Sequence, residues 1–133
     1  MIFASEDIGN ADTNALCVAI NTLIAVKNIG YPEARIPLAQ CVVYLASAVK
    51  SNAAYLAIDK ALNFVRNNPP LPILPHLDNN SVEKKNYLYP HDFGGWVKQQ
   101  YLAKPLKFYE SKGLGDEKKL HEWLEKLKKG ENE

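Results

Sequence analysis

The residues best suited to chemistry lie in one short stretch, 87–96 (YLYPHDFGGW). His91 beside Asp92 could serve as a general base whose imidazole is oriented by a carboxylate. Adjacent residues on extended backbone point in opposite directions, so Asp92 is poorly placed to orient His91. The sequence therefore predicts a turn in which both side chains bond to backbone amides, and it predicts no catalytic residue.

Metal and nucleotide sites have no support in the residue spacing. The two cysteines, Cys17 and Cys41, form no CxxC pattern, and no HExxH occurs, so a zinc site is not predicted. None of the seven glycines is followed by lysine, which excludes a GxxxxGK phosphate loop. Both cysteines fall on apolar helical faces and are predicted to be buried, reduced thiols.

A second group of side chains could bind single-stranded nucleic acid. Aromatic rings stack on bases while a basic groove follows the phosphates, and the segment 84–101 carries both kinds of side chain. The candidates for DNA contact are Lys84, Lys85, Tyr87, Tyr89 and Lys98. The alternative is that these aromatic residues, interleaved with proline and glycine, form a hydrophobic cover over helices.

Four long helices must position these residues. Apolar side chains recur at helical spacing over residues 13–28, 37–49, 51–66 and 116–129. Asp12, Ser51 and Asp116 are the predicted N-caps, and Gly30 ends the first helix. Pro37 suits a first helical turn because its missing N–H would have no partner there. The short links between the first three helices predict that they pack as near neighbours.

The pattern changes between the third helix and the last. Four prolines between positions 69 and 75 force extended backbone, and helical periodicity returns only at Asp116. The stretch nevertheless holds many large apolar residues, which predicts an ordered wrap instead of a disordered linker. A single domain, 1–133, is expected, with an apolar helical core at 1–66, an extended aromatic and proline-rich wrap at 67–115 and a C-terminal helix at 116–130.

Composition narrows the class of protein. With 133 residues, 47% hydrophobic and 23% charged, the chain has the balance of a globular domain. Its net charge of +1 argues against broad electrostatic capture of nucleic acid or of an anionic membrane. No apolar run reaches membrane-spanning length, so no membrane partner is expected, and a cytoplasmic location is predicted, or a nuclear one if the protein is eukaryotic. The first helices carry few charges, and part of their apolar surface is expected to face another chain or domain.

Five separated motifs carry a family resemblance. They are residues 3–12 (FASEDIGNAD), 32–40 (PEARIPLAQ), 50–55 (KSNAAY), 89–93 (YPHDF) and 94–102 (GGWVKQQYL). In this order they resemble the C-terminal region of the RarA/MgsA family, the replication-associated recombination AAA+ ATPases related to the Werner helicase-interacting protein. The chain departs from the family pattern in its short 78–86 stretch and in lacking a proline before Gly94.

The resemblance implies an all-α fold, a helical bundle similar to the C-terminal collar domain of clamp-loader subunits. It also implies that ATP and magnesium belong to an AAA+ core and lid upstream of residue 1, and that this chain holds no cofactor of its own. The parent protein is then expected to be a DNA-dependent ATPase. It would form a homotetramer and act at stalled replication forks, with DNA and other fork proteins as partners. Its expected location is the cytoplasm, in association with the nucleoid.

The leading hypothesis is therefore a tetramerisation module without enzymatic activity. Large aromatic residues and arginine dominate protein interfaces. On that ground the candidate interface residues are Tyr31, Arg35, Tyr44, Tyr55 and Trp96. The alternative is a DNA-contacting module built on the segment 84–101.

Overall fold

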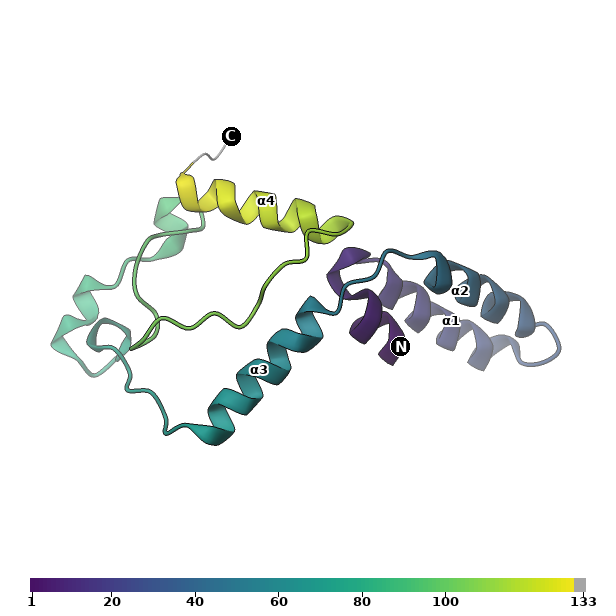
Figure 1. Ribbon diagram of the computed structural model, residues 1–133, viewed down its shortest axis with the longest axis horizontal. Coiled ribbons are helices and arrows are strands. Elements are labelled where there is room, and N and C mark those ends of the chain that lie inside the picture. Colours follow the sequence, from purple (N-terminus) through teal and green to yellow (C-terminus); the bar gives the residue numbers. More distant parts are fainter. Residues whose placement is uncertain (131–133) are drawn as a thin grey trace.

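Helices make up all the regular structure that the computed structural model describes, which covers residues 1–130. The α-helices are α1 Ala15–Ile29, α2 Arg35–Ser47, α3 Ala53–Asn67 and α4 Asp116–Lys129 (Figure 1). The predicted all-α fold is confirmed for these residues, and every predicted long helix is present. None of the helices in this described part is long and apolar enough to cross a membrane.

The helix starts agree only in part with the predicted caps. Asp12 and Ser51 each accept the backbone N–H two residues further on, at 3.0 and 3.3 Å. Helix α2 begins at Arg35, before Pro37, because a proline in the first turn gives up only an N–H that has no partner within the helix. Asp116 is the first residue of α4 and not its cap; there its carboxylate faces the positive end of the helix dipole.

Two short turns that the sequence did not predict come before α1. Ala4–Ile8 is π-helical and Gly9–Ala11 is a 3₁₀ turn. Ile8 is fully buried in them. These turns contact α1, α3 and α4. We call residues 4–11 the hub, because the other elements meet there.

The core is built from small side chains. It consists of Ala4, Ile8, Ala15 and Ala19, with Tyr44, Leu45 and Ala48 of α2 packed against them. Helices α1 and α2 form an antiparallel hairpin that extends from the hub (Figure 1). The larger apolar residues of α1, which mark its periodic stripe, are left between 38% and 52% exposed; they are Leu16, Ile20, Leu23 and Ile24.

Helix α3 does not join α1 and α2 in a bundle, so the predicted near-neighbour packing is right for α1 and α2 and wrong for α3. Its main contacts are with the hub. Figure 1 shows it leaving the hub in the direction opposite to the hairpin. The short 48–52 link therefore turns the chain outward instead of folding α3 back on α2.

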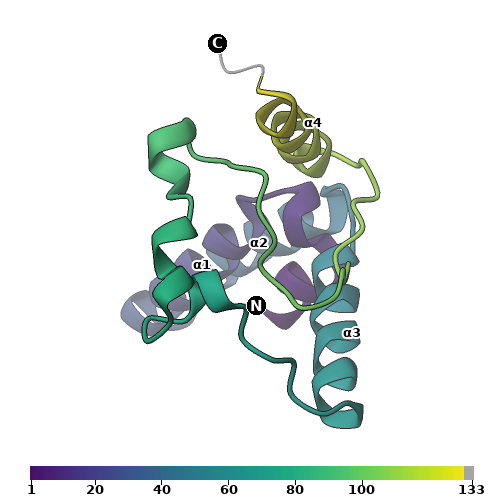
Figure 2. The ribbon, with the colours of Figure 1, turned by 90° about the vertical axis from the view of Figure 1, so that its left-hand side faces the viewer.

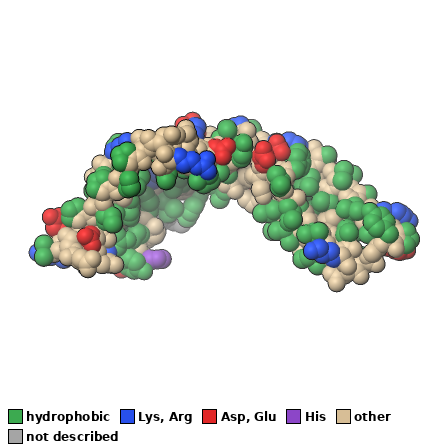
Figure 3. Space-filling model, turned by 90° about the horizontal axis from the view of Figure 1, so that it is seen from below, with side chains coloured by type: hydrophobic (Ala, Val, Ile, Leu, Met, Phe, Trp, Pro, Cys, Tyr) green, Lys and Arg blue, Asp and Glu red, His purple; other side chains and the backbone are tan. Residues whose placement is uncertain are grey.

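The segment after α3 makes three 3₁₀ turns, at Pro75–Leu77, Val82–Asn86 and Pro90–Phe93. It then returns along α3 toward α4 (Figure 2). On the way the ring of Phe108 lies 5.8 Å from that of Phe64, and Glu110 lies 3.6 Å from the ammonium of Lys60. This part of the segment thus covers one side of α3. Figure 3 shows the resulting arch, with the hairpin as one limb and the 3₁₀ turns as the other.

Candidate functional site

A buried carboxylate fixes the start of α4 to the rest of the molecule. Glu117 is only 1% exposed. Its Oε1 accepts the Tyr109 hydroxyl at 2.7 Å, and its Oε2 accepts the backbone N–H of Lys112 at 3.1 Å. One side chain therefore holds the end of the wrap against the first turn of α4.

The hydrogen bonds around Glu117 keep it ionised. Burial by itself opposes the charge, but donation from Tyr109, from Ser51 and from backbone amides outweighs burial and lowers the pKa of Glu117. The pKa of Tyr109 is raised, first by its burial and then by Glu117. Both shifts favour the ordinary protonation states near neutral pH, so this pair is a structural contact and is not poised for proton transfer.

Two glycines allow the backbone to come close at the hub. A Cβ on Gly9 would lie 2.7 Å from the carbonyl oxygen of Ser51, and a Cβ on Gly115 would lie 2.0 Å from that of Ala11. Both glycines also have positive φ, 54° and 55°. The start of α4 can therefore reach the hub only where residue 115 has no side chain.

The candidate general base is in a turn, as predicted, but among the described residues neither the His91 nor the Asp92 side chain bonds to a backbone amide, so that part of the prediction is wrong. His91 and Asp92 lie in Pro90–Phe93, where the backbone N–H of Asp92 donates to the carbonyl of Tyr89 at 3.0 Å. Both side chains are exposed. The ring of His91 lies 5.0 Å from that of Tyr89. Within residues 1–130 no group of three or more His, Cys, Asp or Glu side chains is arranged to hold a metal ion.

The prediction for the cysteines is half right. Cys41 is buried, but Cys17 is exposed. On α1 the buried positions are Ala15 and Ala19, and they form the side that packs in the core. Because a helical turn has 3.6 residues, position 17 lies on the opposite side from both of them. The burial predicted for Cys17 is therefore wrong.

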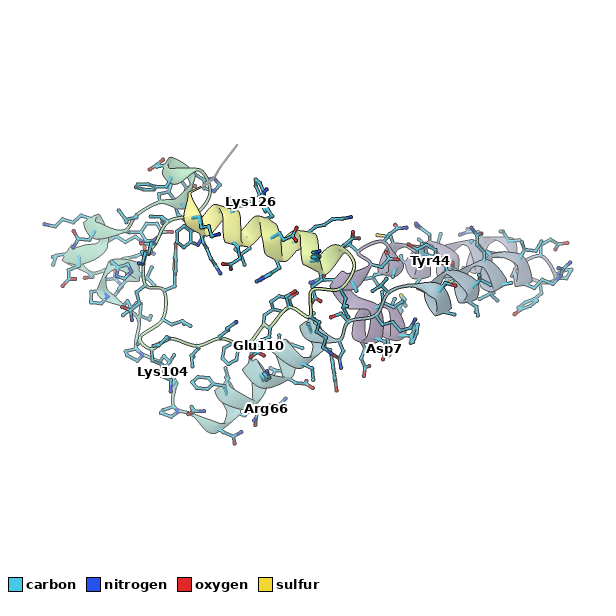
Figure 4. The ribbon with its side chains drawn as sticks, turned by 45° about the horizontal axis from the view of Figure 1, so that its top comes forward. Asp7, Tyr44, Arg66, Lys104, Glu110 and Lys126 are labelled. Carbon is cyan, nitrogen blue, oxygen red and sulfur yellow. The ribbon has the colours of Figure 1, made fainter. Side chains whose placement is uncertain are left out.

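The candidate interface residues are spread over the molecule. Tyr31 is 76% exposed at the tip of the hairpin, and Arg35 begins α2 beside it. The hydroxyl of Tyr44 donates to Asp12 at 2.9 Å, so this side chain also serves the fold. Tyr55 lies on α3 near the hub and Trp96 is half-buried in the wrap. Figure 4 shows Tyr44 on the hairpin, far from the wrap residues Lys104 and Glu110.

The candidate DNA-contact residues are only partly grouped. The ammonium of Lys84 lies 4.8 Å from the centre of the Tyr87 ring, so one face of that ring is already covered by a cation. Tyr89 is 53% exposed, and Lys85 and Lys98 are exposed as well. These side chains lie on the limb of the arch that the 3₁₀ turns form.

The chain leaves much apolar surface exposed, which agrees with the expectation that part of the apolar surface of the first helices is not buried within the chain. The chain exposes 9762 Å². A compact monomer of 14.9 kDa would expose about 7,000 Å². The difference comes from the thin core: most of its buried apolar residues are alanines, while large side chains on all four helices remain exposed. A signal for this was present in the sequence, in the low charge of the first three helices.

A groove lies between the hub and α3 on this surface. It has a volume of about 500 Å³. Its lining is mostly apolar and consists of Met1, Ile2, Ser5, Glu6, Ala54, Tyr55 and Ile58. Of the candidate interface residues, Tyr55 is the one that this groove contains.

The sequence of the chain was compared with known protein families and with individual proteins. The family described as "MgsA AAA+ ATPase C terminal" matches residues 1–128. The chain is 38% identical to Replication-associated recombination protein A of Bacillus subtilis, over 97% of the chain and 34% of that protein. It is 44% identical to an uncharacterized protein of Thermotoga maritima, over 96% of the chain and 22% of that protein. It is 39% identical to ATPase WRNIP1 of Dictyostelium discoideum, over 82% of the chain and 14% of that protein. The chain thus spans about a third or less of each of these relatives.

Proposed function

This chain belongs to the MgsA AAA+ ATPase C-terminal family, and we propose that its function there is to assemble copies of the protein into an oligomer, a homotetramer. Relatives of the chain are named for replication-associated recombination. In the proposed arrangement ATP and Mg²⁺ are bound by an AAA+ core and lid outside this chain. The chain itself contributes the contacts between copies and carries no catalytic group.

The excess of accessible surface is the observation that supports this proposal. The difference from a compact monomer is about 2,700 Å², which is close to what one subunit buries in obligate contacts with its neighbours. Exposed apolar residues on this scale are unusual for a monomeric domain and favour a protein partner. Contact with the AAA+ core and lid of the same protein is proposed to cover the rest.

The first prediction concerns the mass of the chain in solution. By light scattering on a sizing column, we expect a stable species of four chains, about 60 kDa, against 14.9 kDa for one chain. The species should persist over a range of loading concentrations. A monomer at all concentrations would contradict the proposal, and would assign the exposed apolar surface to the rest of the protein.

Direct contact with DNA is a second candidate for segment 84–101. The exposure of Tyr89 supports it, since an exposed ring can stack on a base, and the exposed Lys85 and Lys98 of the same segment could contact phosphates. We expect any such binding to be weak, because Lys84 already covers one face of Tyr87. Fluorescence anisotropy with a labelled single strand would show it as binding that weakens as salt rises. A Tyr89→Ala variant should then lose most of the signal, and no binding at low salt would remove this candidate.

A further inference from the structure

The groove between the hub and α3 is open and lined mostly by apolar side chains. Its walls come from two elements: Met1 and Ile2 precede the hub, while Tyr55 and Ile58 lie one turn apart on α3. These side chains are between 40% and 77% exposed. Burying these four side chains would remove a large apolar surface from water.

Carboxylates lie at the edge of this groove. Glu6 is part of its lining. Asp59 and, more weakly, Glu6 raise the pKa of Tyr55, which places both carboxylates near the hydroxyl of that residue. The groove therefore combines an apolar floor with negative charge at its rim, and a matching partner needs an apolar face with basic flanks.

Helix α4 carries such a face. Leu120, Trp123, Leu124 and Leu127 recur at helical spacing and share one side. The first three of them are 50%, 51% and 40% exposed. Successive residues of a helix are rotated by 100° about its axis. Lys119 and Lys126 therefore flank this stripe on one side, and His121 and Lys128 flank it on the other. Glu122 and Glu125 lie toward the back of the helix.

The lysines on this flank are available for a new partner. Lys119 pairs with Asp116 at 2.8 Å, but its side chain is 80% exposed. A pair this exposed contributes little to stability and can be exchanged for another carboxylate. Lys126 lies on the exposed length of α4 in Figure 4.

Within one chain the two surfaces do not meet. Glu117 and Gly115 fix the start of α4 to one part of the hub. In Figure 1, α4 runs along the upper edge while the N-terminal turns and the start of α3 lie below. No α4 residue lines the groove, and Leu120, Trp123 and Leu124 stay exposed within the chain, so a second copy can supply the partner for each surface.

We propose that copies of this chain join head to tail: the apolar face of α4 in one copy lies in the groove between the hub and α3 of the next, with Lys119 and Lys126 against Glu6 and Asp59. The inference rests on the proposed function and adds to it which surfaces meet. Because the two surfaces differ, each copy offers one of each kind, and such contacts form a closed ring when the rotation from one copy to the next is a quarter turn, as a four-membered ring requires.

Two variants and their mixture test the head-to-tail contact. A groove variant, Tyr55→Asp with Ile58→Asp, and a helix variant, Leu120→Asp with Trp123→Asp, should each be monomeric alone. Mixed together, they retain one intact pair of surfaces, the helix of the first and the groove of the second. The mixture should therefore give a 1:1 dimer, about 30 kDa against 14.9 kDa for one chain, and nothing larger.

A charge reversal with a matched control tests the same contact without placing a charge on an apolar face. Lys119→Glu with Lys126→Glu should weaken association at least about tenfold, because like charges then face Glu6 and Asp59. Lys118→Glu with Lys129→Glu makes the same change in net charge on the back of α4 and should leave association unchanged. Circular dichroism checks that all variants keep the helical content of the parent.

The outcomes separate this inference from the proposed function. If the parent chain is a monomer, both are overturned. If the parent is an oligomer but the variants keep its mass, or the mixture stays monomeric while each variant is folded, assembly uses other surfaces. In that case the head-to-tail contact is wrong and the assembly function stands.

Discussion

Gly115→Ala is expected to lower the free energy of unfolding by about 3 kcal/mol or more. Residue 115 has a φ of 55°, a conformation that costs an L-residue about 1–3 kcal/mol. The added Cβ would also lie 2.0 Å from the carbonyl oxygen of Ala11, which is a backbone atom, and the position of the Cβ is itself fixed by the backbone of residue 115. No side-chain movement can relieve that overlap, so the start of α4 must move away from the hub.

Gly113→Ala is the matched control for this substitution. Gly113 has a similar φ of 67°, but nothing lies within 4 Å of its Cβ position. It should cost only the conformational strain, about 1–2 kcal/mol. Urea unfolding followed by circular dichroism measures both. Equal losses in the free energy of unfolding for the two variants would contradict the expectation that the close approach to Ala11 adds to the cost of Gly115→Ala.

Replacement of Glu117 by glutamine is expected to cost about 2–3 kcal/mol at neutral pH. The amide keeps the size of the side chain, so no cavity opens. However, its NH₂ must face either the Tyr109 hydroxyl or the backbone N–H of Lys112, which are both donors to the native carboxylate. A lost charged hydrogen bond and an unsatisfied buried donor have costs of this order. Glu122→Gln on the exposed side of α4 should change the stability by less than about 0.5 kcal/mol.

The pH dependence of stability gives an independent test of the same residue. The pKa of Glu117 in the folded chain is below its ordinary value of 4.5, so the unfolded chain takes up the proton first as pH falls. The stability that Glu117 provides is then fully present above about pH 4.5 and is lost as pH falls through the lower, folded pKa. The parent should therefore lose stability more steeply below pH 4.5 than Glu117→Gln does. Parallel curves would show that Glu117 is not the titrating group.

The sequence predicted the helices well because their signals are local. Apolar periodicity located all four, and Gly30, with a φ of 73°, ends α1 as expected. The hub was missed because residues 4–11 are too few to show a period and follow π and 3₁₀ geometry. The packing of α3 was wrong because a short link limits distance but leaves direction open.

The core was harder to predict than the helices. The larger residues of α1 recur at helical spacing and favour burial, yet Ala15 and Ala19 are the buried pair. The same reasoning misplaced Cys17. A hydrophobic stripe shows which side of a helix avoids water, and does not show whether that side is covered by the same chain or by another. Glu117 was also missed, since nothing in a lysine-rich stretch marks one glutamate as buried.

The alanine-rich core has a consequence for when conformational entropy is lost. Alanine has no side-chain rotamers to give up, so burying Ala4, Ala15 and Ala19 orders almost no side-chain freedom as a single chain folds. The residues that do have rotamers to lose, such as Ile58 and Trp123, are about half-exposed and keep much of that freedom. In an assembled state these side chains would become ordered when copies associate. Most of the side-chain conformational entropy would then be lost on association, and little of it on the folding of a single chain.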